Sequence, residues 1–135
     1  MSNNLYDLRF LAGVHYFNET DFFEAHEHWE DLWKDYQGPL RKFYQGLIQV
    51  AVCLHHLGNG NVHGARKLYR SSTAYLQPYR PYQEGVDLDQ LVTELTSCCE
   101  DILAPEIEAA RMPVTEEALP KIVLDPAPDE PFVRP

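Results

Sequence analysis

The chain has 135 residues, of which 44% are hydrophobic, and a formal net charge of −10. Its length suits one domain with a single hydrophobic core, and its apolar share argues against intrinsic disorder. The acidic balance argues against bulk binding of nucleic acid, and no apolar run reaches the roughly 18 residues of a membrane-spanning helix.

Helical patterns begin close to the N-terminus. Apolar side chains recurring at helical spacing predict a first helix over residues 4–18. Asp21 and Glu24 form a variant of the capping box, which predicts that a second helix starts there and ends near Tyr36. A third helix is predicted over residues 39–57, since Pro39 suits the first turn of a helix.

Turn signals separate the remaining helices. The run Gly58–Asn61 is typical of a turn, and Asn61 is expected to cap a fourth helix over residues 62–77. Prolines 78 and 81 break the chain into a loop. Asp87 and Gln90 are expected to cap a fifth helix with a clear amphipathic stripe, formed by Leu88, Leu91, Val92, Leu95, Cys99 and Ile102.

The C-terminal part is rich in proline. Seven of the ten prolines lie from Pro105 onward, so after a weak helical extension to Arg111 we expect an extended tail over residues 112–135, packed on the bundle or partly disordered. Short loops favour antiparallel neighbours. The predicted fold is therefore an all-α, compact antiparallel bundle of about five helices over residues 1–111, followed by this tail.

The stretch Phe22–Trp33 (FFEAHEHWEDLW) mixes ionisable and aromatic residues. In a helix, His26 and Glu30 share one face with Phe22, Trp29 and Trp33. A buried carboxylate must be paired or hydrogen-bonded, because its desolvation is costly. We therefore expect His26 and Glu30 to be held out of water, in a polar pocket between the second and third helices. The third helix would complete this pocket with one stripe, Gln45, Gln49 and His56.

This pattern leaves several interpretations open. The pair His26–Glu30 could be a structural hydrogen-bonded pair, or it could border a ligand pocket lined by Gln45, Gln49, His56, Trp29 and Trp33. It could also hold one divalent metal ion, with Glu27 as a general base. The zincin pattern His-Glu-x-x-His is not met, because Glu30 stands in the last position.

The basic residues and the cysteines add two further expectations. Residues 37–83 contain no Asp or Glu but six bases, namely Arg41, Lys42, Arg66, Lys67, Arg70 and Arg80. They could dock between the acidic ends of the chain, or residues 66–80 could form a face that binds anions or nucleic acid.

The three cysteines fit neither a disulfide framework nor a zinc spacing, so we expect buried thiols in a cytoplasmic protein.

Several runs resemble the family called domain of unknown function 309. They are Phe17-Asn18, residues 23–33 (FEAHEHWEDLW), 43–51 (FYQGLIQVA) and 60–65 (GNVHGA), with a weaker likeness at Pro120–Leu124. The resemblance implies a compact helical bundle. It also carries a loose label, predicted metal-dependent hydrolase, under which His26, Glu27 and Glu30 would be metal or catalytic positions, with Gln45 and Gln49 nearby.

The main functional prediction is a small binding or scaffolding module. Association of the chain with copies of itself into a homo-oligomer is a further open interpretation. A metal-dependent hydrolase using His26, Glu27 and Glu30 is the alternative. The third hypothesis is a protein that binds anions or nucleic acid through residues 66–80.

Overall fold

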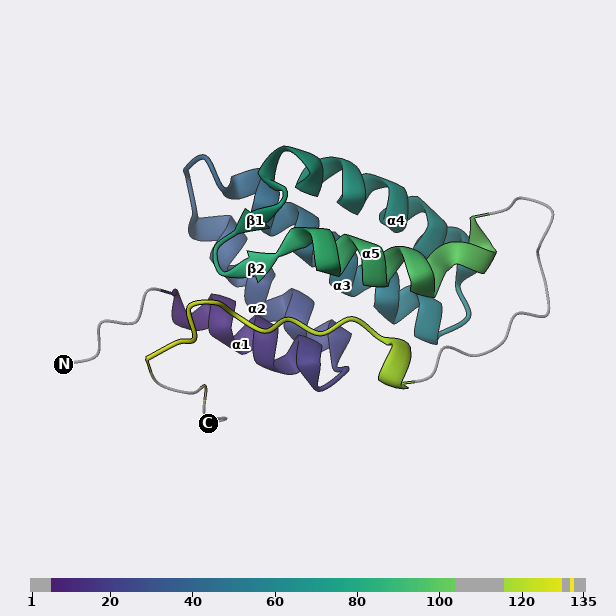
Figure 1. Ribbon diagram of the computed structural model, residues 1–135, viewed down its shortest axis with the longest axis horizontal. Coiled ribbons are helices and arrows are strands. Elements are labelled where there is room, and N and C mark those ends of the chain that lie inside the picture. The colour runs from purple at the N-terminus through teal and green to yellow at the C-terminus, as the bar shows by residue number, and fades with distance from the viewer. Residues whose placement is uncertain (1–5, 104–115, 130–131, 133–135) are drawn as a thin grey trace.

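A computed structural model of the chain describes residues 6–103, 116–129 and 132. Over these residues five α-helices follow one another, with a short hairpin before the last helix (Figure 1). This confirms the predicted all-α bundle of about five helices. The predicted extension to Arg111 lies outside the described residues. The elements are α1 (Leu8–Asn18), α2 (Phe22–Asp35), α3 (Arg41–Gly58), α4 (Val62–Leu76), β1 (Tyr82–Gln83), β2 (Val86–Asp87) and α5 (Leu88–Cys99).

The helices begin at side chains that satisfy their first free N–H groups. Asp21 accepts from the backbone N–H of Glu24, as the capping-box pattern predicts. The predicted caps Asn61 and Asp87 are also confirmed, at 3.0 Å each from the amides of Gly64 and Gln90.

Two helix starts differ from the sequence-based prediction. Helix α1 starts at Leu8 rather than at residue 4, because the Asp7 side chain caps it by accepting from the Arg9 amide at 2.8 Å. Helix α3 starts at Arg41 rather than at Pro39, because a turn precedes it in which the Arg41 amide bonds to the Gly38 carbonyl.

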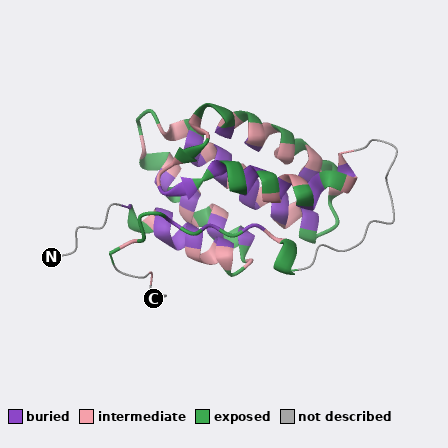
Figure 2. Ribbon diagram, viewed as in Figure 1, coloured by how far each residue is buried: buried purple, intermediate pink, exposed green. Residues whose placement is uncertain are grey.

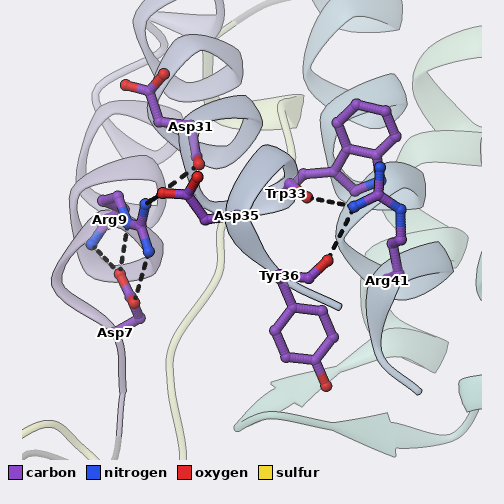
Figure 3. A network of polar contacts seen from close by, with 7 residues as sticks. All are labelled: Asp7, Arg9, Asp31, Trp33, Asp35, Tyr36 and Arg41. Carbon is purple, nitrogen blue, oxygen red and sulfur yellow. Dashed lines mark hydrogen bonds and ion pairs between the residues drawn. The ribbon is translucent and has the colours of Figure 1, made fainter. Parts of the chain in front are cut away.

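A salt-bridge network surrounds this first cap (Figure 3). Arg9 contacts the Asp7 carboxylate at 3.2 Å and the Asp35 carboxylate at 2.7 Å, so it ties the start of α1 to the end of α2. Burial on its own would raise the pKa of Asp7, but the hydrogen bonds and charge of Arg9 outweigh it and lower that pKa below the usual range.

We expect Asp7→Ala to lower the free energy of unfolding at pH 7 by about 0.5–2 kcal/mol, because the cap is lost. Asp7→Asn keeps a capping oxygen, so its free energy of unfolding should fall by less than that of Asp7→Ala. A carboxylate whose pKa is depressed by folding stabilises the fold above its unfolded pKa of about 3.9, and this contribution disappears as the pH falls through the folded pKa. The gap between wild type and Asp7→Asn in urea unfolding should therefore narrow below about pH 4. Equal losses in both variants would contradict the capping role.

The hairpin between α4 and α5 was not predicted from the sequence. Its two strands pair only Tyr82 with Asp87 and Gln83 with Val86, which is too short for an alternating pattern. The turn residues Glu84 and Gly85 have φ values of 50° and 75°. Two successive positive φ values are typical of the tight turns that join antiparallel strands.

The core forms where the inner faces of all five helices meet (Figure 2). Helix α1 packs on α2, α2 on α3, and α3 on α4, while α5 closes the bundle across α3 and α4 (Figure 1). The whole amphipathic stripe predicted for α5 is buried. No helix in the described parts of the chain combines the length and apolar character needed to cross a bilayer.

The three cysteines are buried thiols, as predicted. Cys53 of α3 donates to the Ala65 carbonyl at 3.2 Å and lies 3.8 Å from the sulfur of Cys99. The contact with Cys99, followed by burial, raises the pKa of the Cys53 thiol. A protonated thiol that water does not reach is a poor nucleophile, so Cys53 serves packing.

The described part of the tail returns to the bundle. Residues 116–118 form a 3₁₀ turn, and the chain then runs in extended form beside α1 toward the hairpin (Figure 1). Ile122 and Leu124 are buried against the core, whereas Val123 between them is exposed.

Candidate functional site

His26 and Glu30 lie on one edge of α2, and both are partly exposed. The His26 side chain is 20% exposed and that of Glu30 is 40% exposed, with 3.5 Å between Nε2 and the carboxylate. The prediction of a pair held out of water is therefore wrong. The buried arc of α2 is formed by Phe22, Ala25, Trp29 and Leu32, and His26 and Glu30 stand at the border of that arc rather than within it.

The hydrogen bonds of His26 define what its ring can do. Nδ1 lies 2.8 Å from the Phe23 carbonyl, which can only accept, so Nδ1 carries a proton. Nε2 then pairs with Glu30 only when it is protonated too. Glu30 also lies 3.7 Å from Lys34 Nζ, so His26, Glu30 and Lys34 form a solvent-facing chain of i, i+4 contacts.

These residues do not fit a metal centre. Among the described residues, no group of three or more His, Cys, Asp and Glu side chains is placed to hold an ion. Glu27 is exposed and projects a quarter-turn away from His26, so it adds no third ligand. The donor set of His26 and Glu30 alone is smaller than the three protein ligands of a catalytic zinc site.

The predicted stripe on α3 does not face α2. Gln49 accepts a hydrogen bond from Ser71 on α4, and His56 Nδ1 lies 3.3 Å from Asn61 in the turn before α4. Gln45 is half-buried. The structure thus places Gln49 and His56 toward α4, and the predicted pocket between His26, Glu30 and this stripe is not formed.

The two tryptophans have different surroundings. Trp29 is fully buried and donates from Nε1 to the Phe10 carbonyl at 3.1 Å, so it is a core residue rather than a ligand contact. Trp33 is half-buried under Arg41, whose guanidinium lies 4.1 Å from the ring centroid. Arg41 also donates to the carbonyls of Trp33 and Tyr36, which joins the end of α2 to α3 (Figure 3).

The basic residues are divided between different environments. Arg80 forms a salt bridge with Asp89 at 2.7 Å. This is one contact of the predicted kind, between the basic stretch 37–83 and the acidic C-terminal part of the chain. Arg66 donates from Nε to the Ile102 carbonyl at 2.6 Å. A shallow hollow of about 560 Å³ on α4 is lined by His63, Arg66, Lys67, Arg70 and Ser71. The predicted face over residues 66–80 is therefore reduced to α4, without Arg80.

A hollow does lie between α2 and α3, at one end of the two helices. It measures about 470 Å³ and is bounded by the start of α2 and the end of α3; we call it the Phe23 hollow. Phe23 is 49% exposed, and its ring centroid lies 5.1 Å from that of His26 and 5.7 Å from that of His55. The residues that line the Phe23 hollow are Thr20, Asp21, Phe22, Phe23, Leu54, His55, Leu57, Gly58, Asn59 and Leu119.

The Phe23 hollow contains none of the predicted ligand or metal residues. Phe23 projects away from the buried arc of α2, which a helical wheel of residues 22–33 would have indicated. The contributions of His55 and Leu119 depend on how α2 and α3 pair and on where the tail returns. No local pattern in the sequence carries that information.

All residues that line the hollow except Leu119 lie within a segment shared with known proteins. Residues 10–68 match the family described as Domain of unknown function (DUF309), which confirms the resemblance. The chain is 32% identical over 110 residues to the uncharacterised protein YpuF of Bacillus subtilis (strain 168), covering 78% of this chain and 63% of that protein. It is 27% identical over 75 residues to an uncharacterised protein of Aquifex aeolicus (strain VF5), covering 55% of this chain and 22% of that protein. The chain thus spans less than two-thirds of either relative.

Proposed function

We propose that this chain, a member of the DUF309 family through residues 10–68, is a binding module whose site is the Phe23 hollow. The ligand would be an apolar group of a partner, such as an aromatic or branched aliphatic side chain. The observation that carries the proposal is the large exposure of Phe23 at the mouth of the hollow.

The lining supports this choice of ligand. Leu54, Leu57 and Phe22 form an apolar floor, and burying apolar area there is favourable by about 25 cal/mol per Å². The rim is polar, with Asp21, His55 and Asn59 able to orient a hydrogen-bonding edge. A volume of about 470 Å³ falls within the range of natural ligand sites.

The hydrolase alternative receives less support from the same geometry. His26 borders the hollow only through its ring contact with Phe23, while Glu27 and Glu30 do not line it. The binding function needs neither a metal ion nor a general base, and it uses groups that the fold already holds in place.

The hollow can be probed with indole, an apolar ring with one polar edge. In two-dimensional NMR titrations of ¹⁵N-labelled protein, we expect indole to shift the amide signals of Phe23, His55 and Leu57. Phe23→Ala should weaken binding by a factor of about 3–10, because an aromatic pair contributes about 0.5–1.5 kcal/mol beyond its area.

Leu8→Ala is the matched control, since Leu8 is also exposed, at 71%, but lies on α1 outside the hollow. It should leave the titration unchanged. Shifts that appear elsewhere on the protein, or that survive unaltered in Phe23→Ala, would contradict the proposed site.

A further inference from the structure

The tail segment 119–126, here called the strap, is held on α1 by one asparagine whose side chain forms hydrogen bonds with the strap backbone. The Asn18 side chain donates to the Ile122 carbonyl and accepts from the Ile122 amide, both at 2.8 Å. These two bonds reproduce the pairing that a neighbouring β-strand would offer to an extended chain. They involve main-chain atoms of the strap, so any extended peptide could make them.

The hairpin binds the other end of the strap in the same manner. The Asp125 amide donates to the Gly85 carbonyl at 3.0 Å, and the Tyr82 hydroxyl donates to the Asp125 carbonyl at 2.6 Å. The Tyr6 hydroxyl donates to the Pro126 carbonyl. The groove between α1 and the hairpin, which we call the α1 groove, thus contacts the strap backbone at Ile122, Asp125 and Pro126.

Alternating side chains of the strap provide the selective contacts. Ile122 and Leu124 are 4% and 9% exposed, whereas Val123 is 84% exposed. Lys121 donates from Nζ to the Asn18 carbonyl at 2.9 Å, where the negative end of the α1 dipole favours a cation. The groove therefore fits a lysine followed by apolar residues at alternate positions.

The strap does not fill the groove. A hollow of about 280 Å³ remains beside it, lined by Leu11, Val14, His15, Ile122, Leu124, Pro128 and Phe132. The Nε2 atom of His15 is buried and finds no hydrogen-bond partner among the described residues. An apolar occupant would not satisfy this nitrogen. The free space beside Leu124 nevertheless lets an occupant with a larger side chain at that position bury more apolar area than the strap does.

We propose that the α1 groove is a peptide-recognition site that the strap occupies in cis, and that its partner is an extended segment of another protein with Lys-Ile-x-Leu chemistry and a larger second apolar residue. The α1 groove and the Phe23 hollow share Leu119, which begins the strap and lines that hollow, while the other lining residues of the hollow come from residues 20–23 and 54–59. Binding in trans requires the strap to leave the groove by local opening. A tethered strap also competes at an effective concentration of the order of millimolar.

The full-length chain tests the proposal with a fluorescein-labelled peptide of residues 118–129, followed by fluorescence anisotropy. Ile122→Asp loosens the strap without altering the groove, so it should bind the peptide about tenfold or more tightly than wild type. Val123→Asp is the matched control in the same strap, because Val123 faces solvent, and it should behave as wild type. Adding Asn18→Ala to Ile122→Asp should weaken peptide binding about tenfold.

A peptide carrying Leu124→Phe should bind the Ile122→Asp protein more tightly than the natural sequence, since its ring can enter the remaining hollow. Equal or weaker binding would mean that the groove fits only its own strap, and would overturn the assignment to a partner. The proposal also fails if Ile122→Asp has a wild-type circular dichroism spectrum and does not bind, or if Asn18→Ala has no effect.

Amide hydrogen exchange in the wild type keeps the test decisive if Ile122→Asp does not fold. The amides of Ile122 and Asp125 should exchange faster than those of α3, through local opening. If the amides of Ile122 and Asp125 exchange only through global unfolding, the strap does not leave the α1 groove in the folded protein. That result would overturn the proposal.

Discussion

Trp29→Ala should lower the free energy of unfolding by about 3–5 kcal/mol, the range for truncating a large buried aromatic side chain. Trp29 is fully buried, and its indole centroid lies 5.7 Å from the ring of Phe17. Because whole domains have only about 5–15 kcal/mol of stability, the variant should melt roughly 10–20 °C below wild type in calorimetry.

Two control variants separate packing from hydrogen bonding at this residue. Trp29→Phe keeps most of the ring but leaves the Phe10 carbonyl without its indole donor, so it should lose less, about 1–3 kcal/mol. Trp33→Ala removes a half-buried ring at the end of α2 and should cost less than Trp29→Ala. A Trp29→Ala loss no larger than that of Trp33→Ala would contradict the central packing role of Trp29.

Gly13→Ala is expected to destabilise the protein by about 1–3 kcal/mol or more, although alanine usually favours a helix over glycine by about 1 kcal/mol. A Cβ atom at Gly13 would lie 2.0 Å from Nε1 and 2.2 Å from Cδ1 of Trp29. Because Trp29 is fully buried in a close-packed core, α1 and α2 would have to separate. Urea unfolding would measure the loss.

Gly58→Ala supplies the matched comparison. Gly58 is the last residue of α3, and a Cβ atom there would meet nothing within 4 Å. This substitution should be neutral or stabilising by up to about 1 kcal/mol. The Gly13→Ala loss should shrink in a Trp29→Phe background, because the two residues share one contact. Equal losses in both backgrounds would place the clash elsewhere.

Sequence patterns predicted most of the helices because those signals are local. Caps at Asp21, Asn61 and Asp87 act over three residues, and the stripe of α5 repeats every three to four residues. Such patterns show that a helix has an apolar face. They do not show where the border of that face lies, which is why His26 and Glu30 were expected inside the core and are found at its edge.

By itself, the sequence determined five helices, three of their caps, buried cysteines and the resemblance to a family, since each depends on residues close together in the chain or on motif order. Only the tertiary structure decided that α2 meets α3 through Phe23 and His55, that Gln49 turns to α4, and that the strap returns to Asn18. These contacts depend on how packed helices cross and on residues as much as 104 positions apart, and no periodicity in the chain encodes them.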